Sequence, residues 1–328
     1  MPATNPPPKL SISTKGWTLD YLVEKYGFKP VPRISAQDAD LHKKILKYEA
    51  DKDHKPLVIE GWNNLEAWPS HMFSMDWIRE HFGASKYLDV RNIHSRIDTT
   101  IPFDEFIKMS RNAPFSHLIR VETVRYYGKD AICPQEWVEW LQSDFLPSSL
   151  LPDGSNDLLH KLESAKRVET LMCYLGIGDT FTPCHKDLCA SSGQNLMCYT
   201  ENNGSSFWFM TRGSDAPDMS RYFRDKLGKE LDHENHVITL EQLKDSRLDI
   251  YVVEQKLGDL VLVPPRSCHQ VVNHGGITVK TSWSRMTLAG LETALYHELP
   301  LYRRVCRQET YRVKSIIHRS LQLKTAEI

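Results

Sequence analysis

The sequence predicts a mainly β fold, a double-stranded β-helix of the jelly-roll type with helical additions at both ends. An apolar run at 168–175 predicts a strand, and residues 196–200 and 206–211 alternate around Asn203-Gly204, a pair that favours a tight hairpin. A further apolar run at 258–263 stops at two prolines, which cannot donate hydrogen bonds to a sheet. Short strands joined by turns in this way are typical of jelly rolls.

The part before this core is mostly helical. Apolar residues at helical spacing predict helices over 18–27, 38–51, 75–82, 103–110, 134–146 and 151–166. A strand is expected at 56–59, and the proline-rich first ten residues predict disorder. We divide the chain into a disordered tail (1–12), a helical and early-strand part that packs on the core (13–150), the core (151–290) and C-terminal helices (291–328).

Two charged segments leave alternatives open. Residues 212–250 are too long for a tight connection, so they predict either a flap facing a substrate or a solvated helical decoration. The C-terminal segment 291–323 has an apolar packing face and carries six basic residues, Arg303, Arg304, Arg307, Arg312, Lys314 and Arg319. Such a run is usually a solvated face, and contact with nucleic acid or an acidic partner is the alternative.

Composition limits the class of protein. The chain has 328 residues, of which 41% are hydrophobic and 25% charged, and its formal net charge is −1. These values are typical of a soluble globular protein and argue against a globally electrostatic nucleic-acid binder. We expect no membrane contact and an intracellular location, because the sequence has no signal-like segment and no long apolar run. Seven cysteines without regular spacing indicate free thiols.

The most informative residues are His185, Asp187 and His269. Residues i and i+2 of a strand point to one face, so a single segment can supply the first two as ligands. His269 follows the strand at 258–263 and arrives from a distant part of the sequence. Two imidazoles and one carboxylate form the facial ligand set of non-haem Fe(II) sites, which keep positions open for reactants.

A zinc site is the alternative that the neighbouring thiols raise. Cys184 and Cys189 flank the first two candidate ligands, and Cys268 precedes the third. Zinc sites of sulfur and nitrogen ligands typically use Cys-x-x-Cys pairs, and the sequence contains none. We therefore expect these thiols to fill space in the core, as buried free cysteines usually do.

The stretch from Cys173 to Asp187, with Gly258–Pro264 and Cys268–Gly275, resembles the Jumonji C (JmjC) family of Fe(II)- and 2-oxoglutarate-dependent oxygenases. The resemblance covers about residues 165–290 firmly, and extends more loosely to 55–62 and 126–130. It implies a cupin-type β-helix, Fe(II) held by the three ligands above, and 2-oxoglutarate as cosubstrate. The implied substrate is a protein, such as a methylated histone tail.

The resemblance also implies roles for single residues. Asn195 stands where the family has an asparagine that touches the cosubstrate; a local role in the hairpin is the alternative. Tyr174 stands where demethylases have a tyrosine that lines the substrate pocket, and its aromatic face could hold a methylated ammonium. A tyrosine in a core strand is more often simple packing, so both interpretations stay open.

The main departure concerns the distal carboxylate of 2-oxoglutarate, which the family usually pairs with a lysine where this chain has Ser206. A hydroxyl brings no charge, so the site loses a charge-assisted contact. Lys280 is the best substitute, because it resembles the basic residue by which other 2-oxoglutarate oxygenases bind this group from the last core strand. If Lys280 instead points outward, it is a solvated lysine. Tyr199 and Arg212 are weaker candidates.

Two functions follow from the resemblance. The first is an oxygenase acting on protein, as a lysine demethylase or a side-chain hydroxylase, in the nucleus and on chromatin. The second is a catalytically weak or inactive binding or scaffold protein that has lost the cosubstrate lysine. The intact set of three ligands favours the first.

Overall fold

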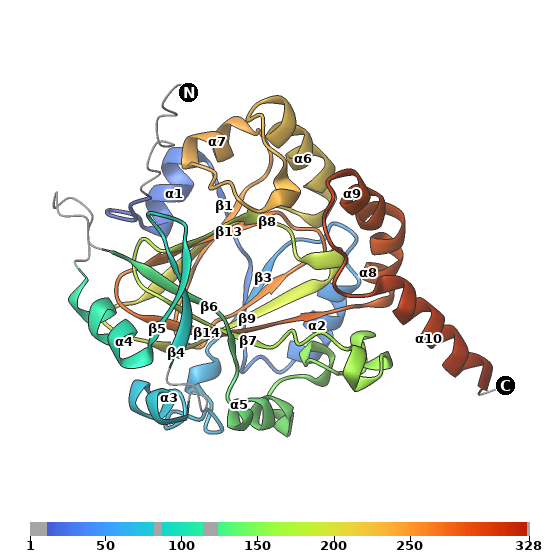
Figure 1. The fold of residues 1–328 in the computed structure, drawn as a ribbon, viewed down its shortest axis with the longest axis horizontal. Coiled ribbons are helices and arrows are strands. Elements are labelled where there is room, and N and C mark those ends of the chain that lie inside the picture. The colour runs from blue at the N-terminus through green and yellow to red at the C-terminus, as the bar shows by residue number, and fades with distance from the viewer. Residues whose placement is uncertain (1–11, 82–86, 114–123, 327–328) are drawn as a thin grey trace.

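The computed structural model describes residues 12–81, 87–113 and 124–326, and its core consists of two sheets (Figure 1). The smaller sheet has five strands in the order β1-β11-β10-β13-β8, with bounds Lys29–Pro30, Tyr251–Gln255, Ser205–Met210, His269–His274 and Phe181–His185. The larger sheet has nine strands in the order β2-β3-β12-β9-β14-β7-β6-β4-β5. Their bounds are Arg33–Ser35, Leu57–Glu60, Leu260–Val263, Ser192–Thr200, Thr278–Arg285, Met172–Gly176, Tyr126–Ile132, Tyr87–Asn92 and Asp98–Pro102. The predicted β-helix core is confirmed.

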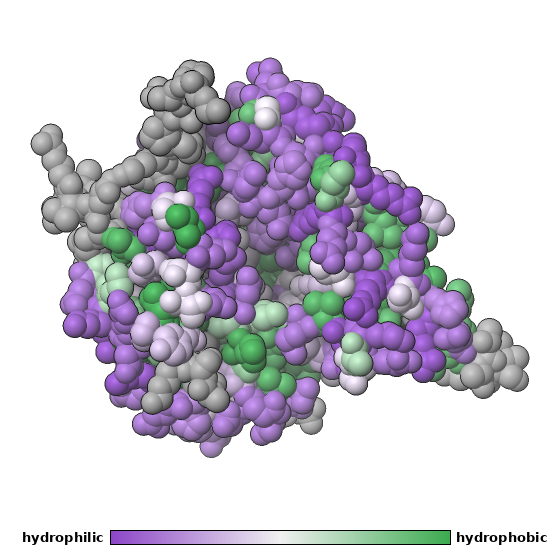
Figure 2. All heavy atoms as spheres, viewed as in Figure 1, coloured by the Kyte–Doolittle hydropathy of each residue, from purple (hydrophilic) through white to green (hydrophobic). Residues whose placement is uncertain are grey.

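Helices cover both sheets on the outside. The helices are α1 (Leu19–Tyr26), α2 (Leu41–Glu49), α3 (Met75–His81), α4 (Phe103–Asn112), α5 (Gln135–Trp140), α6 (Ala216–Asp225), α7 (Leu240–Asp245), α8 (Leu288–Thr293), α9 (Leu299–Arg304) and α10 (Val313–Ala326). In Figure 1, α1, α6 and α7 lie above the smaller sheet, α3 and α5 below the larger one, α4 at its left beside β5, and α8–α10 at the right. On the face in Figure 2 hydrophilic residues predominate and hydrophobic ones form separate groups.

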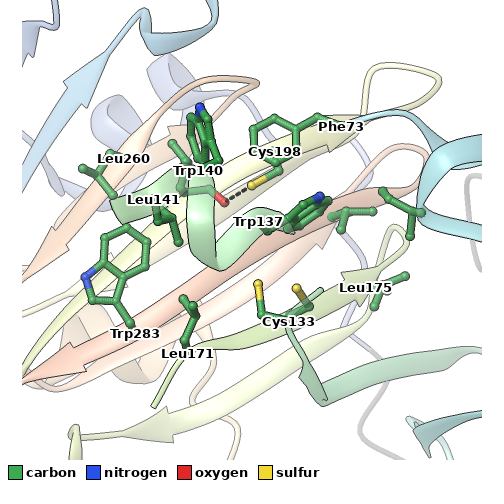
Figure 3. Packing of buried hydrophobic residues seen from close by; sticks show 14 of the residues in the cluster. Phe73, Cys133, Trp137, Trp140, Leu141, Leu171, Leu175, Cys198, Leu260 and Trp283 are labelled. Atoms are coloured by element: carbon green, nitrogen blue, oxygen red, sulfur yellow. Dashed lines mark hydrogen bonds between the residues drawn. The ribbon is translucent and has the colours of Figure 1, made fainter. Parts of the chain in front are cut away.

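Strand residues alternate between two buried surfaces. On β14, Val279 and Trp283 belong to the same buried cluster as Trp137 of α5. Figure 3 shows Trp283 and Trp137 in this cluster. Lys280 and Ser282 of β14 face the space between the two sheets, where Trp208 and Val271 of the smaller sheet also lie. The larger sheet is therefore covered on both faces, and the polar residues of its inner face line the space where a site can form.

Most predicted elements are present. The hairpin of β9 and β10 turns at 201–204, with Asn202 and Asn203 at positive φ. The five helices expected between 18 and 146 correspond to α1–α5, the last of which continues as a wider turn at Leu141–Phe145. The strands β4, β5 and β11 were not predicted. The expected tail at 1–12 lies, except for Ile12, outside the described residues.

The helix predicted at 151–166 is wrong. The chain forms only two short 3-10 turns there, Leu159–Lys161 and Ser164–Lys166. The buried carboxylate of Asp157 accepts hydrogen bonds from the backbone N–H groups of Asp153, Leu159 and Met286. An acidic side chain that binds nearby backbone groups in this way offers the chain an alternative to helix formation.

The insertion at 212–250 is helical, with α6, α7 and a short 3-10 turn, η8 (Leu231–His233). Its apolar residues Met219, Phe223 and Leu243 pack against the smaller sheet. The helical-decoration alternative is thus correct for most of the insertion, and η8 is the part that approaches strand β8.

Candidate metal centre and cosubstrate pocket

The three candidate ligands meet at the junction of two strands. His185 is the last residue of β8 and lies directly opposite His269, the first residue of β13. The rings of the two histidines have their centroids 4.1 Å apart, and Asp187 Oδ1 lies 3.9 Å from His269 Nε2. One ligand atom from each of the three residues lies within 4.8 Å of the others, which makes this the group in the described part of the chain that could hold a metal.

Hydrogen bonds orient both imidazoles for coordination. The Nδ1 atoms of His185 and His269 lie 2.9 and 3.0 Å from the carbonyl oxygens of Pro183 and Ser267. Because a carbonyl only accepts, each Nδ1 carries the proton and each Nε2 presents its lone pair. A Cβ atom at Gly193 would collide with the Asp187 carboxylate, so only glycine leaves room for this ligand. The donor set therefore fits a divalent ion such as Fe(II).

Burial shifts the pKa values of the ligands. It lowers the pKa of His269 to about 4, and burial together with the neighbouring His269 lowers the pKa of His185. Burial raises the pKa of Asp187 to about 6, and His185 opposes this shift. The imidazoles are consequently neutral at pH 7, as metal coordination requires.

Lys280 points into the same pocket as the three ligands. Its ammonium lies 2.9 Å from Ser206 Oγ and 2.7 Å from Asn273 Oδ1, and the side chain is 1% exposed. Within residues 12–81, 87–113 and 124–326 no carboxylate forms an ion pair with it, and burial lowers its pKa to about 7. The pocket thus holds a lysine nitrogen beside Ser206, supplied by strand β14 instead of β10.

Asn195 lies in the middle of β9 and lines the pocket; it is not part of the hairpin turn. Its side-chain oxygen accepts a hydrogen bond of 3.1 Å from Gln255 Nε2, while Gln255 Oε1 accepts one of 2.8 Å from Trp208 Nε1. The Trp208 ring in turn stacks on His269, with centroids 5.9 Å apart. These contacts fix the orientation of Asn195 relative to the metal ligands.

Tyr174 of β7 lines the pocket together with Tyr127 of the neighbouring strand β6. The two rings stack with centroids 6.3 Å apart, and Tyr174 Oη donates a hydrogen bond of 2.9 Å to Asp130. Burial raises the pKa of Tyr174 well above its usual value. The wall therefore consists of two neutral aromatic rings, with a carboxylate at its edge.

The weaker candidates do not reach the pocket. Tyr199 donates a hydrogen bond to Glu201, and Arg212 forms ion pairs with Asp215 and Asp249. The cysteines are free: Cys133, Cys173, Cys184, Cys189, Cys198 and Cys268 are buried, and Cys306 is exposed. None of the thiols joins the ligand group, in agreement with their expected packing role.

Two residues were missed by sequence reasoning. Asn273 binds Lys280 and lies on β13 at even spacing from His269, so strand alternation could have predicted that it faces the pocket. Tyr127 comes from β6, and no motif connects it with the ligands.

The fold is a double-stranded β-helix, and two histidines and one carboxylate are placed in it where they could hold a metal ion. Residues 172–284 match the family described as "JmjC domain, hydroxylase", so this stretch is a JmjC domain, a family whose members are typically Fe(II)- and 2-oxoglutarate-dependent oxygenases. It is similar to the C-module-binding factor A of Dictyostelium discoideum, with 31% identity over 275 residues. The match covers 83% of this chain and 27% of the relative's length. No helix in the described part of the chain could cross a membrane.

Proposed function

We propose that the chain is an Fe(II)- and 2-oxoglutarate-dependent oxygenase that acts on a protein side chain. The observation that carries this proposal is the ammonium of Lys280 at the inner end of the pocket that also contains His185, Asp187 and His269. The departure at Ser206 was the reason to consider an inactive scaffold. Because Lys280 lies beside Ser206, it can replace the missing lysine, and the argument for an inactive scaffold is weaker.

In this proposal each residue has one task. The two imidazoles and the Asp187 carboxylate hold the metal, and Asn195 and Lys280 bind 2-oxoglutarate. Lys280 has three N–H donors and uses two of them on Ser206 and Asn273, which leaves one for the distal carboxylate. With Fe(II) bound, such a centre supplies oxidation of a substrate C–H bond, coupled to decarboxylation of 2-oxoglutarate to succinate.

The substrate that fits the pocket best is a cationic side chain. Tyr127 and Tyr174 offer aromatic faces, and Asp130 adds a negative charge at the edge. Aromatic faces attract alkylammonium groups. We therefore favour lysine demethylation over hydroxylation of a neutral side chain, with a methylated histone tail as the first substrate to test and a nuclear location.

We propose separately that the basic surface beside α10 contacts nucleic acid. Lys166, Lys314, His318 and Arg319 line one hollow beside α10, with Glu163 as the acidic residue among its lining. Arg304 and Arg307, by contrast, form ion pairs with Glu230 and Glu234 of the insertion. The C-terminal surface available for a phosphate backbone is therefore smaller than the basic sequence suggests.

Turnover is tested by measuring succinate. The purified chain, Fe(II), ascorbate and 2-oxoglutarate are incubated with and without a trimethyl-lysine histone peptide, and succinate and formaldehyde are quantified. His185→Ala should abolish both products, whereas His71→Ala, which changes an exposed histidine, should not affect them. Succinate without formaldehyde would indicate hydroxylation or uncoupled turnover. If the metal-loaded parent forms no succinate, the scaffold function is favoured instead.

A further inference from the structure

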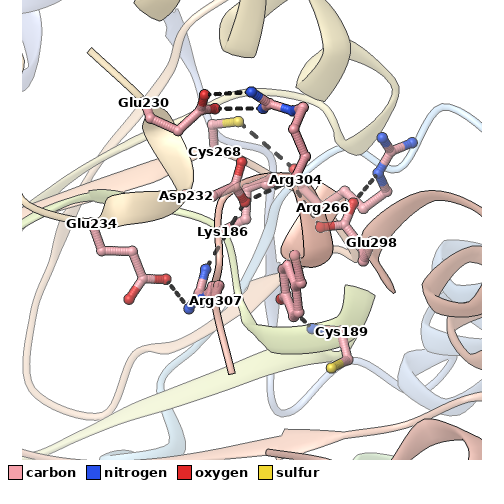
Figure 4. A network of polar contacts seen from close by, with 11 residues as sticks. Lys186, Cys189, Glu230, Asp232, Glu234, Arg266, Cys268, Glu298, Arg304 and Arg307 are labelled. Carbon is pink, nitrogen blue, oxygen red and sulfur yellow. Dashed lines mark hydrogen bonds and ion pairs between the residues drawn. The ribbon is translucent and has the colours of Figure 1, made fainter. Parts of the chain in front are cut away.

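The residue between two of the ligands points away from the metal. Lys186 is 3% exposed, and its ammonium lies 2.8 Å from Glu298 Oε2 and 3.2 Å from Asp232 Oδ1 (Figure 4). Asp232 belongs to η8 of the insertion, and Glu298 ends the short helical segment η9 (Ala294–Glu298) that precedes α9. One buried side chain therefore connects the ligand segment to two elements that are distant in sequence.

The surrounding charges form a compact, balanced cluster. Arg266 Nε lies 2.9 Å from Glu298 Oε1, and Arg307 lies 3.9 Å from Asp232 and 2.5 Å from Glu234. Together with Lys186 these are three cations and three carboxylates. Burial alone would lower the pKa of Lys186, but Glu298 and Asp232 outweigh burial and raise it. Removing one member of such a buried cluster leaves its partners uncompensated.

The ligand segment needs support from outside the sheet. Strand β8 ends at His185, so Asp187 lies beyond the ladder of hydrogen bonds. The next turn, η6 (Leu188–Ala190), is held by Tyr302 of α9, whose hydroxyl accepts a hydrogen bond of 2.8 Å from the N–H of Cys189. On this side, the backbone that carries Asp187 is thus held by the C-terminal helices and the insertion.

We propose that Lys186 is a positioning residue for the metal centre, and that its contacts with Asp232 and Glu298 allow the insertion and the C-terminal helices to set the ligand geometry. The inference rests on the proposed metal centre. It concerns control of the site by two elements: η9, which lies outside the JmjC match, and η8, which lies in the insertion within that match.

The test compares Lys186→Met with Arg304→Gln. Methionine keeps most of the side-chain volume and removes the charge. Arg304 connects the same two segments through Glu230, at 2.8 and 2.9 Å, and within the described residues it forms no hydrogen bond or ion pair with the ligand segment. Co(II) affinity and the visible spectrum of the Co(II)-loaded protein are measured below the melting temperature of each variant. We expect Lys186→Met to lower Co(II) affinity at least tenfold and to alter the visible spectrum. Arg304→Gln should leave the affinity within twofold of the parent and the spectrum unchanged.

A second variant separates positioning from stability. Lys186→Met with Glu298→Gln removes one charge of each sign, so the melting temperature should recover in part while Co(II) affinity stays low. Lys186→Arg should retain most of the affinity. A folded Lys186→Met or double variant with parental affinity and spectrum would overturn the inference alone. A parent that binds no Co(II) would overturn the metal centre, and the inference with it.

Discussion

The protonation of Lys280 should depend on whether the proposed cosubstrate, 2-oxoglutarate, is bound. Within the described residues the Lys280 nitrogen contacts the neutral groups of Ser206 and Asn273, and no carboxylate forms an ion pair with it. A dianionic cosubstrate would supply that partner. The affinity of the pocket for 2-oxoglutarate should therefore depend on this one nitrogen.

Lys280→Met tests this dependence. We expect 2-oxoglutarate affinity to fall by about 10–100-fold, because a hydrogen bond to a charged group is worth about 1.5–3 kcal/mol. Metal affinity should change little. Ser206→Lys in the same background should recover binding, since Ser206 Oγ lies 2.9 Å from the lost ammonium. Titration calorimetry measures the metal affinity and the 2-oxoglutarate affinity. If Lys280→Met binds 2-oxoglutarate as tightly as the parent, Lys280 does not bind the cosubstrate.

The same residue predicts a pH dependence. The pKa of Lys280 is about 7 because of burial, and pairing with the cosubstrate raises it, so binding takes up a proton above pH 7. At saturating metal, 2-oxoglutarate affinity should fall as the pH rises from 7 to 9, by at most about tenfold per pH unit. Lys280→Met should lack this slope. An equal slope in both proteins would assign it to another group.

Asn195→Ala should weaken cosubstrate binding and leave the metal in place. Its side-chain amide, held by Gln255, faces the pocket, and losing a bond to a charged ligand costs about 1.5–3 kcal/mol. Calorimetry with Mn(II) and then 2-oxoglutarate resolves the two steps. Unchanged 2-oxoglutarate affinity in a folded variant would exclude the predicted contact.

At the scale of elements, the sequence allowed the strands that carry ligands to be predicted, but not which way all their side chains point. His185, Asp187 and His269 follow from motif and strand order. The direction of Lys280 could not be decided, because Trp283 on the same strand is equally buried on the other face. When both faces of a sheet are covered, alternation no longer distinguishes inside from outside. The strands β4 and β5 were missed for a different reason: β5, the edge strand, has only one buried residue, Ile101, and its partner β4 is also partly exposed.

Helix α5 shows what the outer cover contributes. Trp137 is fully buried between α5 and the larger sheet, against Phe73 and the strand residues in Figure 3. Trp137→Ala should lower the free energy of unfolding by about 3–5 kcal/mol, because it leaves a large cavity. Metal affinity should be retained, since the indole lies on the face away from the pocket. Urea denaturation and Co(II) titration would check this, and a loss of metal binding in the folded variant would contradict it.

At the scale of the whole molecule, the C-terminal helices act as a separate packing unit. Val313 and Ile316 of α10 are fully buried in a cluster with Leu159 and Tyr302. A chain that ends after Arg312 should therefore melt at a lower temperature, since burying each aliphatic side chain contributes about 1.5–3 kcal/mol. Glu298 and Tyr302, which hold the ligand segment, remain in that chain. Circular dichroism should detect the shift, and an unchanged melting temperature would contradict the packing role of α10.

The distribution of thiols provides a spectroscopic handle. Cys306 is the exposed cysteine, and it precedes Arg307, whose guanidinium contacts Glu234 of the insertion. A maleimide dye should therefore label the native chain mainly at this position without mutagenesis. Its fluorescence would report, in real time, whether the insertion and the C-terminal helices separate when metal, cosubstrate or a peptide binds.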